Sequence, residues 1–296
     1  TLVGESWELA DLGSTAASGG GGGAAHSLIL NGPLAGKPIS AACAAWGPAL
    51  FGACKPAPGG SFPLLVKYLD AREHLSVQVH PSIAYCREHP EAHLKTECWY
   101  VLDAEPDSVI FKGVRKGVTA ADFRAALASD EGAGVVDFLE RVPAVAGECH
   151  NLPSGTVHAL GAGVLVAEVQ TPSDTTFRVY DWAREYGRKG RELHVEPSLA
   201  CIQFEEARDA TRIPAGADRT RHVATGYFDI DEFLLEPGIP TPLAIDGADP
   251  RPQVIMMLRG CASLRSHAGK FPGVAIAQGQ TALVPASLIP DALLVA

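Results

Sequence analysis

The 296-residue sequence lacks the features that mark several specialised classes of protein. Its apolar runs stay short of the ~18 residues that a membrane-spanning helix needs. No basic stretch followed by an apolar stretch opens the chain, as it would in a secretory signal. Neither GxGxxG nor GxxxxGK[ST] occurs, so the common phosphate-binding loops are not indicated. These absences predict a cytoplasmic protein without a membrane partner.

Cysteine pairs and excess positive charge are absent as well. The seven cysteines are odd in number and scattered, and no two of them form CxxC, which indicates reduced thiols and excludes a cysteine-based zinc site. Lys and Arg number 24 against 34 Asp and Glu, so the formal charge is −10. This balance argues against nucleic acid or an anionic membrane as the main partner. An anionic small ligand would need a local basic site.

The composition that remains is typical of a folded β-rich protein. The length predicts about two domains. Twenty-two prolines and 31 glycines separate short runs rich in Val, Leu and Ile, a pattern that favours strands and turns in a barrel or sandwich. The strands predicted in the first two thirds of the chain are Phe62–Leu69, Leu75–Val79, Glu97–Leu102, Ser108–Lys112, Gly155–Leu160, Val164–Gln170 and Thr175–Tyr180.

Helical signals interrupt this pattern in two places. Residues 38–50 are rich in alanine, and a second segment at about 115–142 opens with Thr119, followed three residues later by an acid, as in a capping box. We expect a second helix in this insertion, holding Val136, Leu139 and Glu140. The glycine run at 18–25 predicts a flexible loop.

The polar motifs thin out after Val195, so we place a domain boundary there. Residues 1–196 are expected to form the first domain with its helical insertion, and residues 197–296 a second β domain.

Residues 75–80, "LSVQVH", alternate like a half-buried strand but carry an unusual polar face. Residues i and i+2 of a strand share a face, so Gln78 and His80 project together, alongside Ser76. A single strand histidine is more often a hydrogen-bonded structural residue than a metal ligand. Further motifs are therefore needed to decide between the two interpretations.

Two such motifs follow along the chain. In "NLPSGTVHALG", Pro153 and Gly155 predict a tight turn that delivers His158 to the start of a strand, in a P-x-G-x-x-H spacing found in cupin barrels. Glu97 lies in an otherwise apolar strand, where it is either solvated or else must be paired or bound to a metal, because a lone buried carboxylate is costly. Together with Gln78 and His80, these residues predict a four-ligand site for a divalent metal. Nitrogen and oxygen ligands suit zinc, although the ligand types alone leave iron and manganese open.

Four blocks of the sequence resemble the type I mannose-6-phosphate isomerases in their short bacterial form, a family of the cupin superfamily. The blocks occur in the family order, as "FPLLVKYLDAREHLSVQVHP", "KTECWYVLDAEP", "LPSGTVHALGAG" and "AEVQTPSDTTFRVYDW". The resemblance implies two cupin-like jelly-roll barrels, one zinc ion per chain, and interconversion of mannose 6-phosphate and fructose 6-phosphate. It also implies that the zinc ligands are Gln78, His80, Glu97 and His158.

The resemblance further suggests catalytic residues near the ligands. Lys95 shares a strand face with Glu97, and a nearby zinc ion and desolvation are expected to lower its pKa. Asp174 and Arg178 lie four residues apart and share a face if that stretch is extended, while Glu168 matches another acid of the family; either carboxylate could be the base. The alternatives are that Lys95 is an ordinary surface lysine and that Asp174 and Arg178 form a structural ion pair. Substrate contacts are predicted for Lys67 and Ser76.

The C-terminal part resembles the family only loosely. In "GQTALVPASLIP", Ser or Leu stands where a ligand histidine would, which predicts a second barrel without a metal. Three other functions stay open at this point. They are an isomerase of unphosphorylated aldoses, a non-catalytic sugar-phosphate-binding cupin, and a metal-dependent cupin oxygenase.

Overall fold

The computed structural model describes residues 4–15, 23–204, 218–244 and 249–296. The chain divides into two compact units, each described by itself below. Within the described residues, the first unit holds residues 4–7, 15, 23 and 66–204, and the second holds residues 8–14, 24–65, 218–244 and 249–296. The segment 24–65 therefore groups with the C-terminal part of the chain, while the expected division between residues 196 and 197 stays a prediction.

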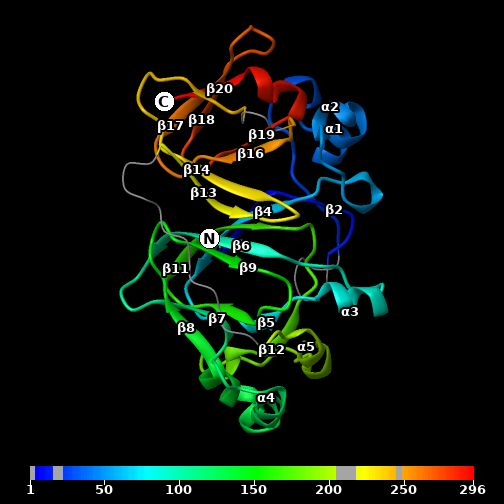
Figure 1. Ribbon diagram of the computed structural model, residues 1–296, viewed down its shortest axis with the longest axis vertical. Coiled ribbons are helices and arrows are strands. Elements are labelled where there is room, and N and C mark those ends of the chain that lie inside the picture. Colours follow the sequence, from blue (N-terminus) through cyan, green and yellow to red (C-terminus); the bar gives the residue numbers. More distant parts are fainter. Residues whose placement is uncertain (1–3, 16–22, 205–217, 245–248) are drawn as a thin grey trace. The chain divides into compact units, whose positions relative to one another are not determined.

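Two five-stranded sheets build the first unit (Figure 1). One has the order β1 (Glu5–Leu9), β4 (Leu65–Ala71), β11 (Val164–Gln170), β6 (Glu97–Ala104) and β9 (Cys149–Leu152). The other has the order β12 (Phe177–Tyr180), β5 (Val77–Val79), β10 (His158–Leu160), β7 (Val109–Val114) and β8 (Leu139–Pro143). The predicted mostly β fold is confirmed.

The two sheets share one buried apolar cluster. Trp99 and Val166 from the first sheet pack in it with Ile110 and Leu160 from the second. Because strand side chains alternate between faces, the residues that point into this space recur at every second position. The inward face of β6 carries Glu97, Trp99 and Val101, all with 1% exposure or less. A polar residue at one of these positions is therefore fixed inside the barrel.

The outer face of the second sheet packs against the helical insertion. Phe123 and Leu127 of α4 (Ala120–Leu127) lie in a cluster with Val179 of β12. The predicted capping box is present, because Thr119 Oγ1 accepts from the backbone N–H of Asp122 while the Asp122 carboxylate accepts from the backbone N–H of Thr119. The 3₁₀ segment η3 (Asp130–Phe138) and α5 (Val195–Cys201) complete this layer.

The second helix of the insertion was predicted too long. Val136 lies in η3, but Leu139 and Glu140 begin strand β8, which pairs antiparallel with β7. Leu139 is buried at 1% exposure and packs in the same cluster as Val136. The apolar residues keep a helical spacing beyond the end of the helical segment. Pairing with β7, and not this spacing, decides where that segment ends.

The second unit is built from shorter strands around an aliphatic core. Its sheets have the orders β15-β20-β17-β18, β16-β19, β13-β14 and β2-β3. The strands are β2 (Asp11–Leu12), β3 (Ala25–His26), β13 (Arg219–Ala224), β14 (Asp229–Phe233), β15 (Thr241–Pro242), β16 (Gln253–Met256), β17 (Cys261–Ser266), β18 (Val274–Ala277), β19 (Thr281–Val284) and β20 (Ala292–Val295). The alanine-rich segment forms α1 (Ile39–Trp46) and α2 (Pro48–Phe51).

Two further expectations concern the glycine run and membrane-spanning helices. Most of the glycine run, residues 18–22, lies outside them. Among the helices that are described, none combines the length and the apolar character required to cross a bilayer.

Candidate metal centre

The pairing of β5 with β10 brings the motif that carries Gln78 next to the motif that carries His158. His158 is the register partner of Gln78, so their side chains are neighbours on one face of the sheet. The Gln78 amide nitrogen lies 3.3 Å from His158 Nε2. A half-turn of the terminal carboxamide would present its oxygen at the same place, so Gln78 can offer an oxygen ligand there.

The turn before β10 fixes His158 relative to His80. The backbone N–H of Thr156 donates to the carbonyl of Pro153 at 3.0 Å, and that of Gly155 donates to the carbonyl of His80 at 3.1 Å. Gly155 has φ +87°, and a Cβ atom there would lie 2.8 Å from the carbonyl oxygen of Cys201. Only glycine meets both conditions without strain. The predicted tight turn is present, and it ties the two histidine strands together.

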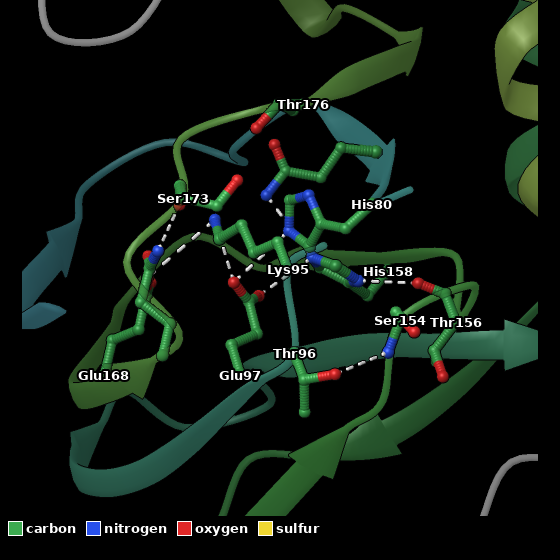
Figure 2. Close-up of polar contacts among 12 residues, drawn as sticks. His80, Lys95, Thr96, Glu97, Ser154, Thr156, His158, Glu168, Ser173 and Thr176 are labelled. Atoms are coloured by element: carbon green, nitrogen blue, oxygen red, sulfur yellow. Dashed lines mark hydrogen bonds and ion pairs between the residues drawn. The ribbon is translucent and has the colours of Figure 1, made fainter. Parts of the chain in front are cut away.

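Three side chains converge in the space between the sheets (Figure 2). Glu97 Oε1 lies 3.0 Å from His158 Nε2, and Glu97 Oε2 lies 3.2 Å from His80 Nε2. The three residues are at most 1% exposed, and one ligand atom from each falls within 4.8 Å of the other two. Residues that are 17 to 78 positions apart in the sequence thus form one buried group.

Backbone carbonyls set the orientation of both imidazole rings. His80 Nδ1 lies 3.1 Å from the carbonyl oxygen of Thr175, and His158 Nδ1 lies 2.8 Å from that of Thr156. A carbonyl can only accept, so each Nδ1 carries the proton and each neutral ring turns a lone pair on Nε2 toward Glu97. Burial and the charge of Lys95 lower the pKa of His80 to about 3, which keeps that ring neutral.

The atoms at the centre of this group lack hydrogen bonds. His80 Nε2 and both carboxylate oxygens of Glu97 are buried without a hydrogen-bond partner of normal geometry, although Glu97 Oε2 forms an ion pair with Lys95 Nζ at 2.9 Å. Such atoms are costly in an interior unless something else binds them. Two imidazole lone pairs, a carboxylate and a neighbouring carboxamide fit a divalent cation.

The charges around the group affect the pKa values of Glu97 and Lys95 in opposite directions. Burial acts to raise the pKa of Glu97, but opposing interactions, the charge of Lys95 foremost among them, hold the pKa well below its ordinary value. Burial acts to lower the pKa of Lys95, as predicted, but Glu97 and Glu168 outweigh it and the pKa is raised. The two carboxylates therefore hold the Lys95 side chain as an ammonium.

A second carboxylate, that of Glu168, also lies near the Lys95 ammonium. Glu168 Oε1 lies 4.0 Å from Lys95 Nζ and 3.7 Å from Lys67 Nζ. Lys67 is 7% exposed, and its ammonium also lies 4.7 Å from the ring centre of Trp7. Lys67, Glu168, Lys95 and Glu97 thus alternate in charge along the barrel interior. The structure brings these four predicted residues together.

The other predicted residues lie at the margin of the group. Strand β12 begins at Phe177, so Asp174 lies in the preceding loop and does not share a strand face with Arg178. The Asp174 charge still acts on Lys95 and raises its pKa. Arg178 is the register partner of Gln78 and donates from Nη1 to the carbonyl of Glu192 at 3.0 Å. Ser76 is buried just ahead of β5.

Two residues that the sequence reasoning missed support this group. Trp99 donates from Nε1 to Glu168 Oε2 at 3.3 Å. Gln170 is fully buried and donates to the carbonyls of Thr171 and Ser173, in the loop that carries Asp174. Trp99 stands two residues after Glu97 and Gln170 two after Glu168, so the strand period would have placed both on the inward face.

Comparison with known proteins gives consistent relatives. No protein-family model matches the chain. The sequence is 40% identical over 182 residues to the mannose-6-phosphate isomerase of Streptococcus mutans, covering 59% of this chain and 55% of that protein. It is 42% identical over 220 residues to a probable mannose-6-phosphate isomerase, GmuF, of Bacillus subtilis, covering 71% of this chain and 66% of that protein. The chain thus spans between half and two thirds of the length of these relatives.

The fold agrees over nearly the whole chain. The crystal structure of a mannose 6-phosphate isomerase from Bacillus subtilis superposes with a TM-score of 0.76 at 26% identity. The match covers 98% of this chain and 86% of that one.

Proposed function

We propose that this chain, which belongs to the mannose-6-phosphate isomerase family, interconverts mannose 6-phosphate and fructose 6-phosphate in the cytoplasm. The observation that carries this proposal is the buried convergence of His80, Glu97 and His158. His80 Nε2 and the Glu97 oxygens have no hydrogen-bond partner of normal geometry there, although Glu97 Oε2 forms an ion pair with Lys95. The catalytic domain would comprise residues 1–196, and residues 197–296 would form the second β domain without a metal.

One zinc ion per chain would be held by Gln78, His80, Glu97 and His158. The mixed nitrogen and oxygen donors, with neutral imidazoles fixed by carbonyls, support this choice of metal. When bound, zinc supplies Lewis-acid stabilisation of the negative charge that develops on a sugar oxygen.

The reaction moves a proton between C1 and C2 through an enediol, so the site needs a base beside the carbon acid. Glu168 is suited to this role, because Trp99 holds its Oε2 while its buried Oε1 accepts no hydrogen bond. We propose that Oε1 takes the proton from one carbon and returns it to the next. The Lys95 ammonium, at 4.0 Å from the same oxygen, would donate a hydrogen bond to the substrate oxygens.

The remaining predicted residues would bind substrate around this centre. Arg178 has a buried Nε without a hydrogen-bond partner, so its guanidinium can still donate to substrate oxygens. Asp174, whose charge reaches Lys95, would orient that ammonium. Lys67 and Ser76 are proposed to contact the sugar phosphate. Lys67 supplies the local positive charge that an anionic substrate needs in a chain of net charge −10.

Turnover of the sugar phosphates by the purified, zinc-loaded protein tests the proposal directly. We expect isomerisation in both directions in a coupled assay, one zinc per chain by elemental analysis, and a higher kcat/KM for mannose 6-phosphate than for mannose. Protein that retains zinc but turns over neither phosphate would refute the function. A higher kcat/KM for mannose would point instead to an isomerase of free aldoses.

Lys95→Ala tests the role of the ammonium. We expect kcat to fall about 100-fold, since a positioned hydrogen-bond donor at a developing charge contributes on that scale. Lys189→Ala is the matched control, because Lys189 is an exposed lysine of the same unit, and its kcat should equal that of the wild type. Normal turnover by Lys95→Ala would remove the role proposed for this residue.

A further inference from the structure

We infer that Trp99 is a positioning residue that fixes the Glu168 carboxylate and the His158 imidazole at the same time. The inference rests on the proposed function, because it assigns Trp99 a part in the chemistry of that site. It starts from the placement of Trp99 on β6, opposite Glu168 on β11 in the register of the sheet. The side chain is 1% exposed, and it is among the largest fully buried side chains.

One end of the indole holds the carboxylate. Trp99 Nε1 donates to Glu168 Oε2 at 3.3 Å, while Glu168 Oε1 has no hydrogen-bond partner and lies 3.7 Å from Lys67 Nζ. A carboxylate anchored through one oxygen can rotate only by giving up that bond. The indole therefore determines which oxygen of Glu168 is left for proton transfer.

The ring of the indole contacts the imidazole. The ring centres of Trp99 and His158 are 5.2 Å apart, and the planes meet at 87° in an edge-to-face contact. Together with the bond from His158 Nδ1 to the carbonyl of Thr156, this contact restricts rotation of the imidazole about its Cβ–Cγ bond. Glu168 and His158 thus have a common support, although they lie on different sheets.

A purely structural explanation makes a different prediction. A buried indole N–H needs an acceptor in any protein, and Glu168 could serve only to satisfy it. In that case loss of the N–H would lower stability and leave kcat intact. If Trp99 positions the carboxylate, loss of the N–H would lower kcat while KM and zinc content stay nearly unchanged.

The substitution Trp99→Phe separates these explanations, because it removes the donor and keeps an aromatic ring. We expect kcat to fall about 10- to 100-fold, the range for a hydrogen bond to a charged group. The matched control is Trp182→Phe, which removes a bond of the same kind from Trp182 Nε1 to the carbonyl of Leu75 at 2.9 Å. We expect its kcat to equal that of the wild type.

A double-mutant cycle with Glu168→Gln tests whether Trp99 acts through Glu168. The two substitutions together should lower kcat no further than Glu168→Gln alone. Full additivity, or wild-type kcat in Trp99→Phe, would overturn the inference while the proposed function stands.

The indole N–H resonances provide a readout that needs neither turnover nor metal. The chain has four tryptophans, and the signal that persists in each of the variants Trp7→Phe, Trp46→Phe and Trp182→Phe identifies Trp99. We expect slow hydrogen exchange at this N–H compared with that of Trp46, which is 37% exposed, and a shift of the signal in Glu168→Gln. A fast-exchanging signal that Glu168→Gln leaves in place would overturn the inference, even if wild-type protein proved inactive or Trp99→Phe failed to fold.

Discussion

The sheets of the two units enclose very different interiors. Between the sheets of the first unit lie Lys67, Lys95, Glu97 and Glu168, all at most 7% exposed. The core of the second unit is a cluster of aliphatic side chains with one methionine, which includes Leu243, Leu264, Ile276 and Leu294. In the second unit, the ion pair of Arg221 with Asp231 joins two partly exposed side chains, and the buried Asp11 pairs with His26, which is partly exposed.

The buried charges of the first unit make its interior less stabilising than an aliphatic interior like that of the second unit. Replacing a buried ion pair with apolar side chains is often neutral or stabilising, so such pairs are weak evidence of a stabilising role. The second unit demonstrates that this chain can fill a β interior with aliphatic side chains. Four charges in the first interior therefore indicate a function for that space.

The largest effect is expected from His158→Ala. Loss of one of four proposed ligands should lower the zinc content of dialysed protein well below one per chain and reduce kcat at least about 1,000-fold. His222→Ala is the matched control, because His222 of the second unit also pairs with a carboxylate, Glu232, at 3.0 Å. Zinc content and kcat should be unaffected there. Equal zinc loss in both variants would contradict a metal site that only the first unit provides.

Leu264→Ala should separate stability from activity. Removal of a buried leucine costs about 2–5 kcal/mol, and Leu264 is 7% exposed within the aliphatic cluster. Urea unfolding should show this loss, while zinc content and kcat of the folded protein stay at wild-type values. A fall in zinc content would mean that the second core also supports the metal site.

Alanine in place of one of two glycines would introduce backbone and steric strain in either the first or the second unit. Gly155 has φ +87°, and Gly52 has φ +55° with its missing Cβ 2.6 Å from Ala286 Cβ. Alanine at either position should lower the free energy of unfolding by about 1–3 kcal/mol. Only Gly155→Ala should weaken zinc binding as well, because its turn positions His158. Titration with a zinc indicator measures this difference.

Asp231→Asn is expected to have the smallest effect. Burial acts to raise the pKa of Asp231, but hydrogen bonds from Arg221 and Arg219 hold it below its ordinary value. A lowered pKa stabilises the folded state above the unfolded value of about 3.9, and this stabilisation is lost as the pH falls through the folded value. The variant should lose about 0.5–1 kcal/mol at pH 7 and less at pH 3, measured by urea unfolding. A larger loss at pH 3 would contradict the assignment.

The sequence predicted the parts of the site that depend on local periodicity. The bounds of β11 agree with the predicted Val164–Gln170, and Gln78 and His80 adjoin the same buried group. The glycine of the turn before His158 was identifiable because few residues adopt its backbone conformation. Such features depend on neighbours within a few positions.

What could not be predicted depends on pairing between distant segments. Glu97, two residues along the chain, contributes most to the raised pKa of Lys95, and Glu168 adds to it because β11 places this second charge nearby, which no local pattern reveals. Asp174 was expected in an extended stretch, but β12 begins only at Phe177. The end of the insertion was wrong for a similar reason, since β7 draws Leu139 into a strand. In each case tertiary pairing outweighed the local signal.

The alternating row of Lys67, Glu168, Lys95 and Glu97 has a consequence for how the interior attracts an anion. Its two ammonium groups and two carboxylates cancel, so the row alone exerts little net pull on a charged solute. A divalent cation bound at Glu97 would leave the interior with two uncompensated positive charges. In a chain that carries −10 overall, these two charges would strengthen the local attraction of an anionic solute.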